Sequence, residues 1–190
     1  GGEWNYLENC TLKNNLIDGS GPGVAGIQIE ESTSNQIRGC AIHGNQHYGI
    51  LIDGNSSQLN VIEDNYIGIN RNENRGSGRQ TTGIFLRGGS NNKIRHNSIA
   101  YHSNTGISIG DAAGTLIEYN HVYHNGPAGI HLGYTSNGTE IRNNRIVDNV
   151  KEIVYGTKTG HGIWIDQGGF NSHIHDNLIS GNEGSGIFAS

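Results

Sequence analysis

Short segments in which aliphatic residues alternate with other residues recur along the whole chain. A glycine-isoleucine pair followed by a second aliphatic residue first appears as Gly26-Ile27-Gln28-Ile29. Alternation with a period of two indicates short β-strands rather than helices. The Gly-Ile pair returns at intervals of 23 or 24 residues, or of 33 or 34 in two cases, at Gly49, Gly83, Gly106, Gly129, Gly162 and Gly186.

A second phrase, Ile-x-x-Asn-x-Ile, follows about eleven or twelve residues after most of these glycines. Its central position holds a cysteine in the first two repeats and asparagine afterwards: Cys10, Cys40, Asn65, Asn97, Asn120, Asn144 and Asn177. A further polar position lies five residues beyond, with a histidine in place of asparagine once: Asn15, Asn45, Asn70, His102, Asn125, Asn149 and Asn182.

Each repeat therefore contains three short segments, and none of them can bury its apolar side alone. Coiling the chain so that like segments stack about 4.8 Å apart solves this problem. Stacked asparagines can then hydrogen-bond above and below, and asparagine tolerates the left-handed backbone of a tight corner. The repeat predicts an all-β fold, a single-stranded parallel β-helix of about seven turns of ~23 residues with three strands per turn.

The composition fits this interpretation. Hydrophobic residues make up only 33% of the 190 residues, with 31 glycines, but a solenoid core is thin and its turns need glycine and asparagine. A net charge of −5 with 12 basic residues argues against a nucleic-acid partner. No apolar run is long enough for a membrane span. The length suits one domain over residues 1–190.

The two phrases resemble the repeats of right-handed parallel β-helix proteins of the pectate-lyase-like superfamily, over nearly the whole chain. That resemblance implies a right-handed helix and a secreted or cell-surface protein that acts on or binds a polysaccharide or oligosaccharide. Members include polysaccharide lyases, glycoside hydrolases, alginate epimerases, phage tailspikes and non-catalytic surface proteins. The chain lacks the calcium and arginine motifs of pectate lyases and the Asp-Pro-His phrase of alginate epimerases, so the resemblance assigns no catalytic residue.

The return to the next Gly-Ile pair is lengthened three times, at Leu16–Ala25, Arg71–Thr82 and Val150–His161. Insertions in a solenoid map to loops on one face, and in lyases of this fold such loops wall a substrate groove over the Gly-Ile strand. The alternative is that an exposed corner tolerates extra residues at little cost.

The outward residues of the Gly-Ile strands would form the floor of that groove. Phe85 and Trp164 are a candidate sugar platform, unless the inserted loops fold over them. The first outward row reads Gln28, Leu51, Phe85, Ser108, His131, Trp164 and Phe188. The second reads Glu30, Asp53, Arg87, Gly110, Gly133, Asp166 and Ser190.

Two groups of ionisable residues are candidates for a catalytic or metal-binding site. Glu30 and Asp53 on adjacent rungs suit a retaining glycosidase pair or, with Glu31, a calcium site, although an ion pair with Arg87 would explain Asp53 equally. A uronide lyase needs a cation for the carboxylate and groups that remove and donate protons. The candidate proton-transfer residues are His131 and Tyr134 with Arg87 and Asp166, and the candidate substrate-binding residues are Phe85, Trp164, Asp111, His161 and Lys158.

Other ionisable residues are interpreted as structural. The second strand carries an outward row of alternating sign that would hold the register: Glu8, Arg38, Glu63, Arg95, Glu118, Arg142 and His175. Cys10 and Cys40 should stack as free thiols, with a disulfide as the alternative. His173 and His175, and the group His121, Tyr123 and His124, are expected on solvated surface.

The sequence leaves open whether the protein is an enzyme. The leading hypothesis is a polysaccharide-binding protein of lyase or glycoside hydrolase type. The competing hypothesis is a non-catalytic scaffold, adhesin or filament subunit. No capping helix is evident at either end, which an excised fragment, irregular caps or end-to-end association of copies would each explain.

Overall fold

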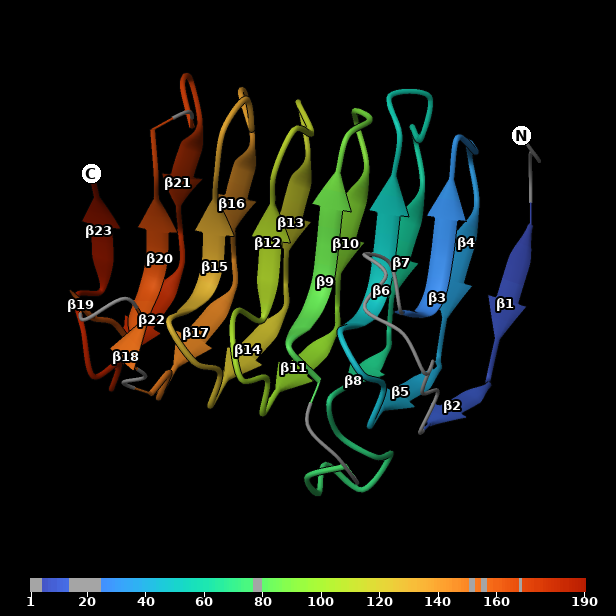
Figure 1. Ribbon diagram of the computed structural model, residues 1–190, viewed down its shortest axis with the longest axis horizontal. Helices are drawn as coiled ribbons and strands as arrows, with labels where there is room; N and C mark the ends of the chain where they lie inside the picture. Colours follow the sequence, from blue (N-terminus) through green and yellow to red (C-terminus); the bar gives the residue numbers. More distant parts are fainter. Residues whose placement is uncertain (1–4, 14–24, 77–79, 151–152, 155–156, 168) are drawn as a thin grey trace.

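The computed structural model describes residues 5–13, 25–76, 80–150, 153–154, 157–167 and 169–190. Three parallel seven-stranded sheets run the length of the molecule, and the chain visits each sheet once per turn. Figure 1 shows the rungs following one another along the long axis from β1 to β23, with the two termini at opposite ends. This arrangement confirms the predicted β-helix.

The first sheet holds the glycine-isoleucine phrases and is called the Gly-Ile sheet. Its strands are β3 (Ala25–Glu30), β6 (Tyr48–Asp53), β9 (Thr82–Arg87), β12 (Ile107–Ile109), β15 (Ala128–Leu132), β20 (His161–Ile165) and β23 (Ile187–Ala189).

The second sheet, called the ion-pair sheet, holds the start of each asparagine phrase. Its strands are β1 (Tyr6–Glu8), β4 (Gln36–Arg38), β7 (Val61–Glu63), β10 (Lys93–Arg95), β13 (Leu116–Glu118), β16 (Glu140–Arg142) and β21 (His173–His175).

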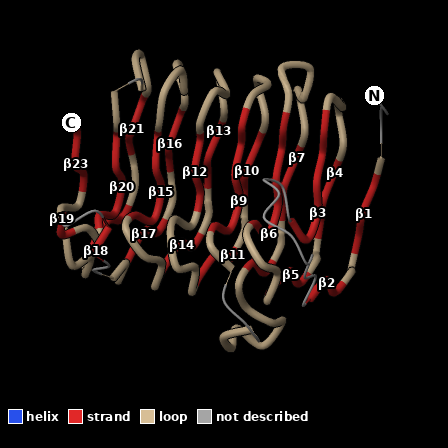
Figure 2. Tube along the Cα trace, in the orientation of Figure 1, coloured by secondary structure: helices blue, strands red, loops and turns tan. Residues whose placement is uncertain are grey.

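The third sheet completes each turn. Its strands are β2 (Thr11–Lys13), β5 (Ala41–His43), β8 (Tyr66–Ile67), β11 (Ser98–Ala100), β14 (His121–Tyr123), β17 (Arg145–Val147) and β22 (Leu178–Ser180). A small antiparallel pair, β18 (Ile153–Val154) and β19 (Thr157–Lys158), precedes β20. Figure 2 shows strands and loops along the described trace and no helix, and none of the described residues forms a helix long and apolar enough to cross a membrane.

The core is a column of isoleucines between the three sheets. One inward residue from each sheet, such as Ile84, Ile94 and Ile99 in one turn, is fully buried. Because every rung places the same residue type at the same position, like side chains stack along the axis. Burying one such side chain stabilises the fold by about 1.5–3 kcal/mol.

Asparagines form a continuous ladder at the corner between the ion-pair sheet and the third sheet. The side-chain amide of Asn97 donates to Asn120 Oδ1 at 3.0 Å, and the backbone N–H of Asn97 donates to the same oxygen at 3.0 Å. The same amide contact, also at 3.0 Å, joins the other neighbours of the ladder, which runs Asn65, Asn97, Asn120, Asn144, Asn177. Cys40 begins the series, because its N–H donates to Asn65 Oδ1 at 2.9 Å.

The left-handed residue at this corner is the one before each ladder position, not the ladder asparagine itself. It has a φ between 53° and 62° in every rung: Asn9, Gly39, Asp64, His96, Tyr119, Asn143 and Asp176. The expectation that the ladder asparagines adopt this conformation was therefore wrong. The preceding residue turns the chain, which leaves each ladder side chain free to point along the axis toward its neighbour.

The second polar ladder contains Gln80 where the sequence suggested Asn70. Asn45 donates to Gln80 Oε1 at 2.7 Å, and Gln80 Nε2 lies 3.1 Å from His102 Nε2. The series continues from His102 to Asn125, Asn149 and Asn182. Asn70 instead closes a turn, because its Oδ1 accepts the N–H groups of residues 72 and 74.

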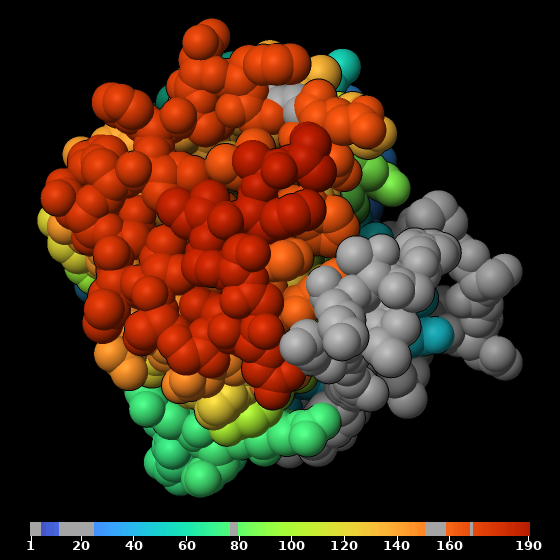
Figure 3. Space-filling model, turned by 90° about the vertical axis from the view of Figure 1, so that its left-hand side faces the viewer, coloured from blue at the N-terminus to red at the C-terminus, as the bar shows by residue number. Residues whose placement is uncertain are grey.

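The second insertion therefore leaves the solenoid before the ladder position and not after it. Its described part, residues 70–76, folds toward the third sheet: a side chain at Gly76 would meet the Cβ of His43 on β5 at 2.4 Å. The loop projects beyond the corner (green in Figures 1 and 3). The expectation that this insertion walls the Gly-Ile face stays a prediction, because residues 77–79 lie outside the described residues and Thr81 and Thr82 border that face. The first insertion lies outside the described residues except for Ala25, and residues 151–152 and 155–156 of the third insertion also lie outside them.

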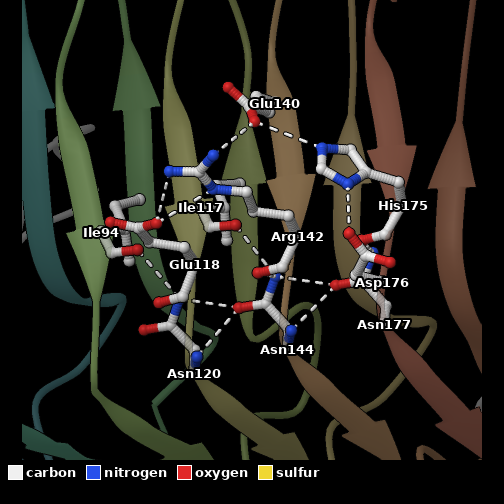
Figure 4. Close-up of polar contacts among 10 residues, drawn as sticks. All are labelled: Ile94, Ile117, Glu118, Asn120, Glu140, Arg142, Asn144, His175, Asp176 and Asn177. Atoms are coloured by element: carbon white, nitrogen blue, oxygen red, sulfur yellow. Dashed lines mark hydrogen bonds and ion pairs between the residues drawn. The ribbon is translucent and has the colours of Figure 1, made fainter.

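The ion-pair sheet confirms the predicted alternation of charge. Strand register places Glu8, Arg38, Glu63, Arg95, Glu118, Arg142 and His175 in one row. Arg142 binds Glu118 at 2.9 Å, and Glu140 bridges Arg142 at 3.1 Å and His175 at 3.2 Å, above the asparagine ladder (Figure 4). A slip by one rung would bring like charges together, so the row holds the register. Both cysteines are free thiols.

Candidate functional site

The central outward row of the Gly-Ile sheet is the row expected from the sequence. Cross-strand register aligns Gln28, Leu51, Phe85, Ser108, His131, Trp164 and Phe188. One member departs from the expectation of an exposed floor, because Leu51 is completely buried. Gln28 at the start of the row is exposed, and the members from Phe85 onward are partly exposed.

Aromatic rings gather at the C-terminal half of this row. The rings of His131 and Trp164 lie 5.0 Å apart, and Trp164 lies 6.3 Å from Phe188. Both Trp164 and Phe188 are partly exposed. Trp164 therefore presents an aromatic surface directly beside a histidine.

His131 has the electrostatics of a proton acceptor. Burial lowers its pKa, and the nearby Asp166 carboxylate opposes that shift, so the ring is neutral at pH 7. Its Nδ1 lies 3.4 Å from Ser108 Oγ, while its Nε2 is buried without a hydrogen-bond partner among the described residues. An unsatisfied buried polar atom costs about 1–3 kcal/mol, and native structures hold few of them.

Two glycines pack closely beside the rings. A side chain at Gly133 would begin 3.3 Å from His131 Cε1, and one at Gly110 would begin 3.4 Å from a ring carbon of Phe85. Both positions lie in the second outward row, between Arg87 and Asp166. A side chain at either position would therefore crowd the ring beside it.

Polar groups border the site on the side where the strands end. Asp166 accepts the N–H of Gln167 at 2.9 Å, and Tyr134, 59% exposed, lies with its hydroxyl 3.4 Å from Gln167 Oε1. Asp111 accepts a hydrogen bond from Thr135 at 2.7 Å. Asp111, Tyr134 and Asp166 therefore follow three successive rungs along one edge.

Arg87 lies apart from His131. Its Nε donates to Asp53 Oδ1 at 3.0 Å, and a terminal nitrogen binds the other oxygen. This contact holds the pKa of Asp53 below its usual value. Strand β9 is two strands from β15, so about 10 Å separates the two positions. The structure does not bring Arg87 and His131 to one sugar ring.

Glu30 and Asp53 occupy adjacent rungs as expected, but each carboxylate has a protein partner. Glu30 accepts a hydrogen bond from Gln28 at 3.1 Å, and Glu31 accepts the N–H of Ser56 at 2.9 Å. No group of three His, Cys, Asp or Glu side chains within the described residues is placed to hold a metal ion. Calcium binding at this pair stays a prediction.

His161 was expected on a flanking loop, but it is the first residue of β20 and is buried. Its Nδ1 accepts the N–H of Ser185 at 3.0 Å, and its ring stacks on Phe188 at 4.6 Å. These contacts give it a packing role. Lys158 lies on β19, and its side chain is outside the described structure.

Sequence reasoning missed a small hollow on the same face. It has a volume of about 150 Å³ and lies at the start of β6 and β9. Tyr48, whose ring lies 5.3 Å from Phe85, stands two residues before the inward Ile50, so strict alternation would place it inward and gave no signal for this contact. The hollow is lined by His47, Tyr48, Thr81, Thr82, Phe85, Asn104 and Ser108.

Comparison with known families agrees with the geometry. The model of a family described as a right handed beta helix region matches residues 1–76 and 69–190. The chain is a right-handed β-helix protein. No curated protein sequence matches this β-helix.

Several solved structures share its fold. The β-helix superposes on a variant of the periplasmic alginate epimerase AlgG with a TM-score of 0.77 and 18% identity, covering 98% of this chain and 38% of that one. The A-module of the Azotobacter vinelandii mannuronan C-5 epimerase AlgE4 superposes with a TM-score of 0.59 and 15% identity, covering 98% of this chain and 57% of that one. DFA-IIIase from Arthrobacter chlorophenolicus A6 without its lid superposes with a TM-score of 0.57 and 17% identity, covering 92% of this chain and 41% of that one.

These likenesses concern the fold. The β-helix spans between 38% and 57% of the three chains that it matches. What those proteins act on is therefore not carried to this chain by the superposition.

Proposed function

We propose that this β-helix binds a polysaccharide along the Gly-Ile sheet, outside the cell or at its surface, and acts on it at His131. The observation that carries the proposal is the contact between His131 and the partly exposed Trp164 on adjacent rungs of the Gly-Ile sheet. The apolar face of a sugar ring packs well on an indole. A sugar seated on Trp164 would bring its polar groups to the imidazole.

Removal of a proton next to a carboxyl group is the reaction class that fits best. A neutral histidine is a competent general base near pH 7, and the lowered pKa keeps His131 neutral. Tyr134 and Asp166 lie on the same edge and would donate a proton or orient the ring. Two of the similar structures are epimerases of alginate or mannuronan, which are proteins that act on acidic polysaccharides.

Glycoside hydrolysis has weaker support. It needs one carboxyl group as acid and a second as nucleophile or base. Asp53 is held by Arg87, and Glu30 is bonded to Gln28. The candidate pair is therefore engaged within the protein, whereas His131 Nε2 has no partner in the described structure.

Proton abstraction can be tested without knowing whether the product is cleaved or epimerised. Incubation of uronic-acid polysaccharides in deuterated water would place deuterium at the carbon that loses its proton, read by NMR, and ultraviolet absorbance would detect unsaturated ends. We expect exchange that is lost in His131→Ala and reduced in Trp164→Ala. His173→Ala, an exposed histidine on the ion-pair sheet, is the matched control and should leave the exchange unchanged.

A non-catalytic scaffold is the second candidate. The pairing of Arg87 with Asp53 and the packing of His161 are features of a stable surface rather than of a reactive one. Exchange and binding that are absent for every polysaccharide would favour the scaffold. End-to-end association, which this candidate includes, would appear as concentration-dependent sedimentation.

A further inference from the structure

A second cluster of aromatic and ionisable side chains lies on the third sheet, away from the Gly-Ile sheet. His121 and Tyr123 point outward from β14 on either side of the buried Val122, with their rings stacked at 4.2 Å. Tyr101 and His124 occupy left-handed corner positions after β11 and β14, with rings 5.3 Å apart. The sequence suggested solvated surface for three of these four residues, but the fold brings them into contact.

The four rings form one continuous group. Tyr123 lies 6.0 Å from Tyr101 and 5.4 Å from His124, edge to face in both cases. All four side chains are partly exposed. The next outward positions on the neighbouring rungs, Ala100 and Val147, are small and buried. No large side chain therefore stands directly beside Tyr123 in its outward row.

Two arginines flank the rings. Arg145 on β17 donates from Nε to His121 Nε2 at 3.3 Å, and Arg75 lies over the Tyr101 ring at 5.7 Å. Both arginines are exposed. Arg75 belongs to the inserted loop, so the insertion supplies a cation to this cluster. In solenoids, insertions often mark the binding face.

Charged side chains of both signs surround the rings. Arg145 and the carboxylates of Glu73 and Asp148 all lie close enough to act on the titration of His121, and Arg75 lies over Tyr101. Arg145 is exposed, and its one side-chain hydrogen bond within the described residues uses Nε. An exposed guanidinium beside aromatic rings complements a ligand that combines a carboxylate with an apolar ring face.

We infer that the rings of Tyr101, His121, Tyr123 and His124, with Arg75 and Arg145, form a second binding site for an acidic sugar of an oligosaccharide. The sugar ring packs on the exposed aromatic faces, and its carboxylate binds the Arg145 guanidinium, which His121 holds by one edge. The site binds without catalysis and would keep the polymer attached to the protein. This inference rests on the proposed function only in its choice of ligand class, an acidic saccharide.

The test uses two readouts that separate the two faces. In a Trp4→Phe background Trp164 is the remaining tryptophan, so occupation of the Gly-Ile sheet changes its fluorescence and occupation of the third sheet does not. Calorimetric titration with size-defined uronic-acid oligosaccharides counts both sites. We expect two sites per chain, one of which is silent in fluorescence. Carboxyl-reduced oligosaccharides should lose the silent site.

Variants assign the silent site. Arg145→Gln should weaken it about tenfold or more, the effect of losing one charge-assisted hydrogen bond, and Tyr101→Ala should weaken it as well. Arg38→Gln, an exposed arginine of the ion-pair sheet, is the matched control. Thermal unfolding of each variant shows whether it is folded, and Arg145→Lys keeps the charge while losing the planar fork.

Each outcome decides between the two proposals. A single fluorescence-active site that Arg145→Gln leaves unchanged overturns the second site and leaves the proposed function standing. If Arg145→Gln abolishes binding and Trp164→Ala retains it, the second site is supported and the placement of the first site is overturned. No binding of any uronic-acid oligosaccharide overturns both.

Discussion

The buried histidine of the second ladder should make the stability of this protein depend on pH. His102 is 3% exposed and replaces asparagine in the series. Asn45 donates to Gln80 Oε1, which turns the Gln80 NH₂ group toward His102 Nε2 at 3.1 Å. His102 Nδ1 then donates to Asn125 Oδ1 at 2.8 Å. The ladder therefore requires a neutral ring with its proton on Nδ1.

Protonation would place a second N–H group against the Gln80 amide with no acceptor between them. Burial is the main cause that lowers the pKa of His102 from 6.5 to about 4, and the Asn125 hydrogen bond opposes the shift. The unfolded chain therefore takes up this proton at a higher pH than the folded protein does. The stability that the neutral His102 ring contributes is fully present above about pH 6.5 and is lost as the pH falls toward 4.

The size of the effect follows from the shift. A change of about 2.5 pKa units at 1.36 kcal/mol per unit corresponds to about 3 kcal/mol. This is a large part of the free energy of unfolding of a typical domain, about 5–15 kcal/mol. Acid should thus weaken the solenoid well before its carboxylates are protonated.

Urea unfolding at about pH 7 and about pH 4.5 measures the loss for the native chain and for His102→Asn. Asparagine fills the position as it does in other rungs but takes up no proton. We expect the variant to be less stable at neutral pH, because its side chain is shorter, and to lose less stability in acid. The other histidines cancel in this comparison, and His173→Asn serves as an exposed control. Equal losses for native chain and His102→Asn would refute the reasoning.

Three further predictions concern the frame. Asn120→Ala should lower the free energy of unfolding by about 2–4 kcal/mol, because it breaks both side-chain links of the first ladder and leaves buried groups unpaired. The exposed Asn137→Ala is the control, and a comparable loss of stability in that variant would contradict this prediction. Gly83→Ala should lower the melting temperature, since its Cβ would lie 2.5 Å from the Gly106 carbonyl oxygen; an unchanged melting temperature would show that the rungs can separate. His175→Gln should remove a small stabilisation that is present below pH 6.5 and is lost as the pH rises, because Asp176 and then Glu140 raise the His175 pKa; the stability difference from the native chain should shrink between pH 6 and pH 8.

Most of the frame could be predicted from the chain because the repeat is local. A residue two places after each Gly-Ile glycine faces outward in a strand, so the row that contains His131 and Trp164 follows from counting. The alternating charges from Glu8 to His175 follow in the same way. The burial of Leu51 and His161 could not be counted, since it depends on what the neighbouring turns place above them.

The sequence by itself determined the three strands per turn, their register and the identity of each outward row, because side chains alternate with a period of two and like rungs stack. The tertiary structure decided where the second insertion leaves the solenoid. Counting cannot tell whether Asn70 or Gln80 fills the ladder, since that depends on which side chain reaches both neighbours. It also decided that Arg75 reaches Tyr101 across the corner. These contacts join residues whose spacing in sequence follows no period, so only the folded chain brings them together.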